Sequence, residues 1–423
     1  MPKLYEYQGK RLLRSFNIPV PQGDVASTPA EAGRIAAKLA KTVVIKAQVG
    51  ATGRFKAGGI KFADNASEAE KMASELLGKE IQGLRVEKVL VEEKLAIEKE
   101  FYAGIIVNDS WKVKGPVLMF STQGGVDIEE VAAKSPEKVA SMNVDVLEGL
   151  TSEDTRDLIS KLDVSPSLVE PLSRVVYGLY QVFRQYDARS AEINPLVLTP
   201  CSSEDYYTGG ISPADCRIVV DEASVFKHPE LEIEYPRDIG RAATELEQLA
   251  WKVEEEDYRG VGYFVQMAKD FGPGEGYIGF HGIGGGGAML GADALIRQGL
   301  KLADYADTSG NPTASKVYRV VKLIFSQPNI DGYVLMGAVM ANQEQWHHAH
   351  ALVRALREEL ANRPNFPAIL LIAGNKEAES LEILREELKG LPAKVEVYGR
   401  DYVYNVDYVA KRMKELVAEY RGA

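Results

Sequence analysis

The sequence YIGFHGIGGGG at residues 277–287 joins an apolar, strand-like run to four glycines that open a helical pattern. Four further strand-like runs alternate with helical patterns downstream, at 302–305, 333–336, 369–372 and 395–398. This alternation predicts an α/β fold in which a parallel sheet has helices on both faces. Five such units predict a flavodoxin-like doubly wound domain over residues 260–423, with ligands at the carboxyl ends of its strands.

Three loops are expected to meet at that edge of the sheet. Gly285 and Gly286 lie where the backbone N–H groups of a helix N-terminus suit a carboxylate. Ser309 and Gly310 follow the second strand, and Asn342 closes the loop after the third. These five residues are the predicted site for a substrate carboxylate. The alternative is that the glycines only permit tight strand–helix turns.

Composition and charge restrict the class of protein. Of 423 residues, 45% are hydrophobic and 26% are charged, a balance typical of a soluble globular protein. At this length two or three domains are expected. The formal net charge is −11 and basic residues form no block, so nucleic acid is not an expected partner. An anionic substrate would therefore depend on local features such as glycine loops, fixed cations and a bound metal ion.

The chain carries no pattern typical of secretion or membrane insertion. Its first residues contain no apolar segment followed by a small-residue cleavage site, and no apolar run reaches the length of a membrane span. Its two cysteines, Cys201 and Cys216, form neither a CxxC pair nor a disulfide framework. We therefore expect a cytoplasmic protein without a membrane partner.

The first half of the chain, residues 1–235, mixes helices and strands of uneven length. A helix is expected at 5–16, and a second begins after Thr28, which Glu31 joins in a capping box. A long, mainly polar helical stretch covers 150–185. Strands are expected at 42–47, 86–92, 101–107, 117–121, 192–198 and 217–220. The acidic stretch 232–258 is interpreted as the connection between the halves.

One strand of this half ends on a lysine and runs into a glycine-rich loop. The strand contains Lys46, and the loop carries Gly53, Arg54, Lys56 and three further glycines. Accessible backbone N–H groups and fixed cations suit a polyphosphate. The alternative is a surface hairpin with solvated charges. The loop is neither a Walker A sequence nor a GxGxxG fingerprint.

Acidic and amide side chains lie at the ends of the neighbouring strand candidates. Glu92 ends an apolar strand, where it could accept hydrogen bonds from a ribose or an adenine edge, and Glu100 precedes the next strand. Alternation places Glu192 and Asn194 on the same face of a third strand, and Asp215 precedes a fourth. Amide and carboxylate oxygens suit Mg²⁺, with phosphate oxygens and water completing the octahedron. Taken singly, each acid is also compatible with a solvated strand end.

In combination, these motifs resemble one family over nearly the full length of the chain. The sequence is similar to the ATP-grasp β subunits of succinyl-CoA synthetase. The resemblance is carried by YEYQGK at 5–10, VIKAQ at 44–48, GRFKAGG at 53–59, GGVDIE at 124–129 and EINPLV at 192–197. It implies an N-terminal ATP-grasp fold ahead of the doubly wound domain.

The resemblance also implies a role for each candidate residue. The nucleotide, ATP or GTP, would be bound by Lys46, Gly53, Arg54, Lys56, Glu92 and Glu100. Asn194 and Asp215 would hold Mg²⁺. Glu192 would be the catalytic residue that faces an incoming phosphohistidine.

The sequence departs from that family's pattern in two places. Thr52 and Phe55 stand where the succinyl family usually has glycines, and Phe55 is shared with the related citrate-cleaving enzymes. An insertion at 201–211 precedes Asp215. The assignment of Asp215 as a metal ligand therefore depends on how well the residues around it match, and Asp221 is the alternative.

The chain lacks a histidine suited to carry phosphate. In this family that histidine lies on a partner α subunit, which also holds most of the CoA site. None of the histidines here has the glycine-flanked context of that nucleophile: His228, His281, His347, His348 and His350. His281 is interpreted as structural, and the three that follow Trp346 as helix surface, with a metal bound by His347 and His350 as the alternative. The chain is therefore expected to be half an enzyme.

The resemblance does not indicate a single substrate. The loops at 303–310 and 341–342 resemble those of ATP-citrate lyase and citryl-CoA synthetase more than those of succinyl-CoA synthetase. However, the stretch 369–375 has no arginine where both families place one, and a tricarboxylate would lose a charge-assisted contact there. We therefore predict succinate ahead of citrate, with another dicarboxylate such as malate open.

The expected activity is the reversible ligation of succinate and CoA, with ATP converted to ADP and phosphate, in the presence of an α subunit. One alternative is a self-contained ATP-grasp ligase that needs no partner. Another is a non-catalytic nucleotide-sensing or scaffolding subunit. The sequence leaves open ATP versus GTP, the physiological direction, and an αβ versus an α₂β₂ assembly.

Overall fold

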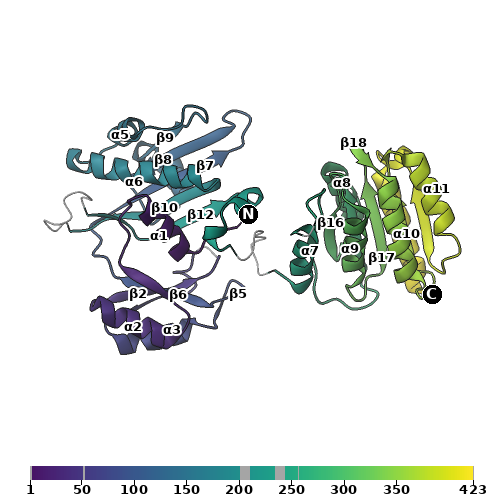
Figure 1. Cartoon of the computed structure of the whole chain (residues 1–423), viewed down its shortest axis with the longest axis horizontal. Coiled ribbons are helices and arrows are strands. Elements are labelled where there is room, and N and C mark those ends of the chain that lie inside the picture. Colours follow the sequence, from purple (N-terminus) through teal and green to yellow (C-terminus); the bar gives the residue numbers. More distant parts are fainter. Residues whose placement is uncertain (1, 51–52, 201–209, 234–242, 256, 423) are drawn as a thin grey trace. The chain divides into compact units, whose positions relative to one another are not determined.

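The chain folds into two compact units, Met1–Ala242 and Ala243–Ala423. The structure is a computed structural model that describes residues 2–50, 53–200, 210–233, 243–255 and 257–422 (Figure 1). Within these residues, none of the helices has the length and apolarity needed to cross a membrane.

The smaller sheet of the first unit has helices on one face and carries Lys46 on the other. This antiparallel sheet has the order β1-β6-β2-β3, formed by Gly23–Ala26, Lys88–Glu93, Val43–Gln48 and Ile60–Ala63. Helices α2 (Pro29–Leu39) and α3 (Ala66–Leu76) cover one face and pack on the odd-numbered residues of β2 (Figure 1). Because side chains alternate along a strand, Lys46 points to the opposite face. The predicted capping box of α2 is confirmed, since Thr28 accepts a hydrogen bond from the Glu31 amide.

The larger sheet of the first unit is also antiparallel. Its order is β11-β10-β7-β8-β9, and β12 pairs with β10. Its strands are β7 (Lys99–Asn108), β8 (Gly115–Ser121), β9 (Val139–Asn143), β10 (Ala188–Leu198), β11 (Ile211–Pro213) and β12 (Cys216–Val220). Helices α1 (Glu6–Ser15), α5 (Ser152–Ser160) and α6 (Pro166–Gln185) contribute to its hydrophobic core.

Short elements connect these strands. They are β4 (Glu80–Ile81), β5 (Leu84–Arg85), α4 (Ile128–Lys134), and the 3₁₀ turns Pro136–Lys138, Glu222–Lys227 and Pro229–Leu231.

The long, mainly polar helical stretch predicted over 150–185 is helical but consists of two helices. Helix α5 ends at Ser160, and α6 begins at Pro166, which occupies the first helical turn where its missing N–H costs nothing. Helix α6 is amphipathic, because Leu172, Val176 and Leu179 are fully buried against the larger sheet.

The second unit confirms the flavodoxin-like prediction. Its five parallel strands lie in the order β16-β14-β17-β19-β21, which is 2-1-3-4-5 in chain order. They are Asp304–Asp307, Tyr277–Ile283, Gly332–Gly337, Pro367–Leu371 and Lys394–Tyr398. An antiparallel strand missed from the sequence, β13 (Tyr263–Gln266), extends the β16 edge.

Two hydrophobic cores lie on the two faces of this sheet. One contains residues of α9 (Ala314–Phe325), α10 (Trp346–Leu360) and α11 (Glu377–Glu387), and the other contains residues of α8 (Gly285–Arg297) and α12 (Val406–Gly422). The remaining elements are β15 (Lys301–Leu302), β18 (Val339–Glu344), β20 (Gly374–Asn375) and the 3₁₀ turn Arg400–Tyr402. Parallel pairing of β18 with β20 extends the structure beyond the carboxyl ends of the central strands.

The stretch 232–258, interpreted as a connection, contains a helix of the second unit. Helix α7 (Glu245–Glu255) buries Ala250 and Val253 in the core that also contains Phe264 of β13. The acidic composition of the stretch concealed this short amphipathic pattern.

Candidate active site

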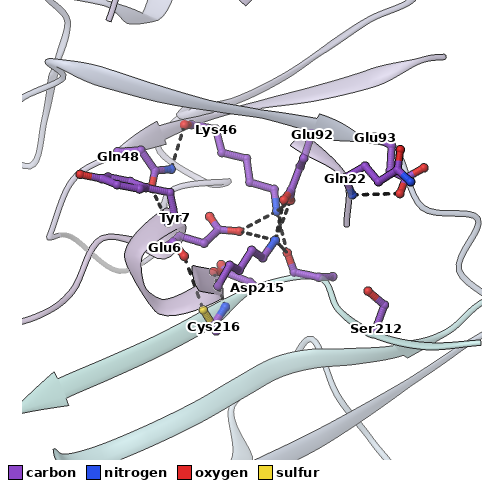
Figure 2. Close-up of polar contacts among 12 residues, drawn as sticks. Glu6, Tyr7, Gln22, Lys46, Gln48, Glu92, Glu93, Ser212, Asp215 and Cys216 are labelled. Atoms are coloured by element: carbon purple, nitrogen blue, oxygen red, sulfur yellow. Dashed lines mark hydrogen bonds and ion pairs between the residues drawn. The ribbon is translucent and has the colours of Figure 1, made fainter. Parts of the chain in front are cut away.

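Six charged side chains meet at the face of the smaller sheet opposite α2 and α3. Three are cations and three are carboxylates: Lys10, Lys46, Arg54, Glu6, Glu92 and Asp215. In Figure 2, Lys46 and Glu92 extend from the sheet toward Glu6 of α1 and toward Asp215. The six charges sum to zero, so the cluster compensates its own burial.

The two lysines of this ion cluster share Glu6 and Glu92 as partners. Lys46 Nζ donates to Glu6 Oε1 at 2.8 Å and to the Ala214 carbonyl at 2.6 Å, and it also pairs with Glu92. Lys10 Nζ lies 2.7 Å from Glu92 Oε1 and 2.9 Å from Glu6 Oε1. Burial alone would raise the pKa of Glu6, but the three surrounding cations lower it well below its usual value. The pKa of Lys46 is raised, because its carboxylate partners outweigh the effect of burial.

Arg54 joins the glycine-rich loop to the cluster. Its Nη2 lies 2.7 Å from Glu6 Oε2 and 2.8 Å from both carboxylate oxygens of Asp215. The loop folds back on β2, because the Gly59 amide donates to the Arg54 carbonyl and the Ala47 amide donates to the Gly59 carbonyl, each at 2.8 Å. This hairpin fixes the guanidinium next to Lys46. Thr52 lies outside the described residues.

A cavity of about 250 Å³ borders the ion cluster. Its lining residues are Lys3, Leu4, Glu6, Val49, Gly50, Gly53, Arg54, Phe55, Ile60, Glu192, Asp215, Cys216 and Arg217. Predicted phosphate-binding, metal-binding and catalytic residues therefore share one cavity. Phe55, which replaces a glycine of the family pattern, is 70% exposed.

Glu192 is held on the wall of this cavity by side chains from two neighbouring strands. The Tyr102 hydroxyl donates to Glu192 Oε2 at 3.4 Å, and Arg217 Nη1 lies 3.9 Å from Glu192 Oε1. Burial raises the pKa of Glu192, and Arg217 and Tyr102 partly offset this. In the register of β7 and β10, Glu192 lies opposite Gly104, so the ring of Tyr102 reaches Glu192 across the bare backbone of Gly104.

Gly104→Ala is expected to lower the free energy of unfolding by about 1–3 kcal/mol, since an added methyl group would overlap the Tyr102 hydroxyl in a packed sheet. The measurement is denaturant unfolding of the chain. Gly115→Ala is the control, because a methyl group there would meet no atom closer than 3.8 Å. Equal effects of the two substitutions would show that the Tyr102 ring does not need the space above Gly104 to pack as described.

The predicted metal ligands are neighbours. The Asn194 amide N–H donates to the Asp215 carbonyl at 3.1 Å, and the Asn194 side chain accepts from the Gly125 amide at 2.7 Å and donates to the Val126 carbonyl at 3.1 Å. The backbone contact makes Asn194 and Asp215 neighbours, while the Asn194 side chain bonds to the loop at 125–126 and the Asp215 carboxylate pairs with Arg54. No group of three His, Cys, Asp or Glu side chains suited to a metal occurs in the part of the chain that the structure describes. The pair therefore fits an ion that takes its other ligands from phosphate and water.

Asp221, the alternative to Asp215, is placed elsewhere. It follows the opposite end of β12, where its amide donates to the Asp187 carbonyl at 3.0 Å. Its side chain caps the following 3₁₀ turn and borders a different cavity. The geometry therefore favours Asp215 over Asp221, although the insertion between Asn194 and Asp215 lies largely outside the described residues at 201–209.

Two of the charged residues predicted to bind the nucleotide lie outside the ion cluster. Lys56 is exposed on the glycine-rich loop. The Glu100 carbonyl accepts from the Gly124 amide at 3.2 Å, and its side chain lies beside Gly125, on the Asn194 side of the site. The structure thus brings together Lys46, Arg54, Glu92 and Asp215, and it places Glu100 next to the loop that holds Asn194.

Sequence reasoning missed Glu6, Lys10 and Tyr102 as site residues. Glu6 and Lys10 are spaced four apart on α1, in line with the buried Leu13. Two charged residues on the apolar face of an amphipathic helix require buried partners of opposite charge. This pattern could have identified Glu6 and Lys10 as site residues from the sequence.

The predicted carboxylate residues of the second unit lie at the carboxyl ends of its strands. Gly285 and Gly286 begin α8 with open space beside their Cα atoms. Ser309 Oγ donates to Asp307 at 3.2 Å, and Gly310 has a positive φ of 73°. Asn342 is part of β18, and its side chain lies outside the described residues.

A cation does lie at the end of the fourth strand, although the stretch 369–375 contains none. Arg400, from the loop after β21, reaches back so that its Nη2 donates to the Gly374 carbonyl at 3.3 Å. Its Nε also donates to Glu377 at 2.7 Å. The guanidinium at the end of β19 therefore comes from the loop after β21 and not from the loop after β19 itself. The sequence of the loop after β19 could not indicate it.

The interpretation of all three C-terminal histidines as helix surface is wrong for His348, which is fully buried. His347 and His350 flank the Trp346 ring, with ring centroids 3.8 Å and 5.8 Å from it. His281 is fully buried, in agreement with the interpretation that it is structural.

Stability of the second unit should fall as the pH drops from 6.5 to 4. Burial lowers the pKa of His348 from 6.5 to about 4, so the unfolded chain takes up a proton in this range before the folded chain does. The stabilisation is complete above pH 6.5, and its loss by pH 4 is about 3 kcal/mol. Calorimetric unfolding against pH measures it. His348→Gln should reduce this dependence without removing it, because burial also lowers the pKa of His281, and an unchanged slope would contradict the assignment.

Comparison with known proteins places the chain in a class and then in a family. Residues 3–198 match the ATP-grasp domain family, and residues 274–411 match the family described as ATP citrate lyase citrate-binding. A structure of ATP citrate lyase from Methanothrix soehngenii in complex with citrate and coenzyme A superposes with a TM-score of 0.77, covering 98% of this chain and 99% of that one at 18% identity. The fold is therefore that of an ATP-grasp protein, with an ATP-grasp unit followed by a flavodoxin-like unit.

Curated relatives narrow this class further. The β subunit of the GDP-forming succinate–CoA ligase of Thermus thermophilus is 38% identical over 389 residues, covering 90% of this chain and 93% of that protein. The β subunit of the ADP-forming enzyme of Methanothermobacter thermautotrophicus is 35% identical over 392 residues, covering 92% and 94%. The chain belongs to the family of succinate–CoA ligase β subunits.

Proposed function

We propose that this chain is the nucleotide-binding β subunit of a succinate–CoA ligase, which joins succinate and CoA as ATP or GTP is converted to its diphosphate and phosphate. The observation that carries the proposal is the convergence of Arg54, Asp215 and Glu192 on one cavity, where Lys46 pairs with the lining residue Glu6, in a chain whose relatives match over nearly their full length. Both ADP-forming and GDP-forming relatives match, so the nucleotide stays open.

The cations of the ion cluster are the proposed phosphate ligands. Lys46 and Arg54 carry fixed positive charge beside the cavity, where Glu6 and Asp215 pair with them. A bound polyphosphate would offer its own oxygens as partners for these two cations. Asn194 and Asp215 would hold Mg²⁺, whose charge would offset that of the phosphate oxygens. The contribution of this chain is therefore positioning and charge neutralisation.

The phosphate carrier is proposed to come from a partner α subunit. The described lining of the cavity includes no histidine, and His281 and His348 are fully buried in the other unit. In the proposed sequence, an α-subunit histidine accepts the phosphoryl group, succinate takes it to form an acyl phosphate, and the CoA thiol displaces phosphate. Glu192 would face the histidine and accept a hydrogen bond from its ring.

Citrate is the second candidate substrate. The match of residues 274–411 to a citrate-binding family and the predicted resemblance of two loops favour it. Against it, the full-length curated relatives are succinate–CoA ligase subunits. Succinate is therefore retained as the proposed substrate.

The test is hydroxylamine trapping of acyl products in the presence of Mg-ATP and CoA. The chain alone and the chain co-expressed with its α partner are compared with succinate, citrate and malate. We expect a signal with succinate that requires the partner. A signal from the chain alone would instead identify a self-contained ligase, and a signal with citrate would identify the second candidate.

A further inference from the structure

A chain of buried polar side chains lies beneath the predicted carboxylate loops of the second unit. Its members are fully buried, and none was among the predicted site residues: His281, Thr308, Gln343, Gln345 and His348. Buried polar groups of this kind hold a single arrangement when all their hydrogen bonds are made.

His348 joins two of the loops directly. Its Nε2 lies 2.9 Å from both the carbonyl oxygen and the hydroxyl of Thr308, and its Nδ1 lies 3.3 Å from Gln343 Nε2. A carbonyl oxygen can only accept, so Nε2 carries the proton, and Nδ1 of the neutral ring accepts from the Gln343 amide. One imidazole therefore connects the loop after β16 to β18.

The remaining contacts extend this connection to two more strands. Gln343 Oε1 accepts from the Asn311 amide at 3.0 Å. Gln345 Nε2 donates to the Ala373 carbonyl after β19 at 2.9 Å, and His281 of β14 lies 2.7 Å from the Thr308 hydroxyl. The buried chain thus links four neighbouring strand ends.

The linked residues are direct neighbours of the predicted carboxylate ligands. Thr308 precedes Ser309, and Gln343 follows Asn342. We propose that His348 is a positioning residue of the carboxylate site, which holds the loop 308–311 and β18 in the arrangement that binds the substrate. This inference rests on the proposed function. Without a polar side chain at 348, the Thr308 carbonyl and the Gln343 amide would each lose a buried partner, so both loops would rearrange.

The test uses the complex with the α partner and a matched pair of variants. His348→Met and His348→Gln place side chains of similar length at this position, but only glutamine offers both a donor and an acceptor. We expect His348→Met to raise the KM for succinate about tenfold or more, while the KM for Mg-nucleotide changes less than about twofold, because the nucleotide residues lie in the other unit. His348→Gln should restore the KM for succinate. His350→Met, on the exposed side of α10, is the control.

Each outcome decides the inference. A wild-type KM for succinate in His348→Met, or an equal rise in both KM values, would overturn it. If His348→Met does not assemble, Gln343→Met removes the same contact from the other side and is judged by the same two KM values. Wild-type complex without succinate-dependent turnover would instead contradict the proposed function, before any variant is compared.

Discussion

Replacing Glu6 with glutamine is expected to lower the free energy of unfolding of the first unit by about 3–5 kcal/mol. Glu6 lies within 2.9 Å of Lys10, Lys46 and Arg54, and the substitution would leave three buried cations facing two carboxylates. An uncompensated buried charge costs more than the pair itself contributes. The measurement is denaturant unfolding of the chain, followed by a probe in the first unit.

The control is Glu70→Gln, an exposed position on α3. The double variant Glu6→Gln, Lys46→Met removes one charge of each sign, so it should be less destabilised than the sum of the two single variants. Additive effects would show that Glu6 and Lys46 do not interact in solution.

The pH dependence of the first unit has a defined sign. Because the folded pKa of Glu6 is lowered below the usual 4.5, its stabilisation is present above that pH and is lost as the pH falls further. The wild-type chain should therefore lose stability below pH 4.5, and Glu6→Gln should show a smaller loss over the same range. An equally steep loss in both proteins would contradict the lowered pKa.

The parts of the fold that the sequence predicted are those with local patterns. Five alternating strand and helix patterns were enough for the doubly wound sheet, because each βα unit buries its own apolar residues. The mainly polar composition of 150–185 concealed the apolar stripe that starts at Leu172. Strand β13 was missed for another reason, since a four-residue edge strand carries little periodic signal.

The candidate site was predicted from strand ends and a glycine loop, but its partners were not. Lys46 and Arg54 follow from the residues around them, whereas Glu6 contacts Lys46 across 40 residues and Asp215 contacts Arg54 across 161. Such pairs depend on the packing of α1 and β12 against the smaller sheet, which no local pattern encodes. The same limit applies to His348, whose partner Thr308 lies 40 residues away.

Replacing Glu192 with glutamine is expected to reduce succinate-dependent turnover of the complex by about 10²–10⁴-fold, as for carboxylates that orient a catalytic histidine. Glu192 lines the cavity but takes no part in the pairing among Lys46, Arg54 and Glu6. Glutamine keeps the shape of the side chain and loses the charge that would stabilise a cationic imidazole. Fold and nucleotide affinity should therefore persist, which calorimetric titration with Mg-nucleotide would verify.

Two further variants separate this effect from a general disturbance of the site. Asp215→Asn should weaken Mg-nucleotide binding itself, because it removes the negative charge of a proposed metal ligand that also pairs with Arg54. Glu137→Gln, at an exposed position beyond α4, should leave both readouts unchanged. If Glu192→Gln retained turnover within about threefold, the carboxylate could not be orienting the partner's histidine. If instead it lost nucleotide affinity as Asp215→Asn does, Glu192 would belong with the metal ligands Asn194 and Asp215 rather than with the phosphoryl acceptor.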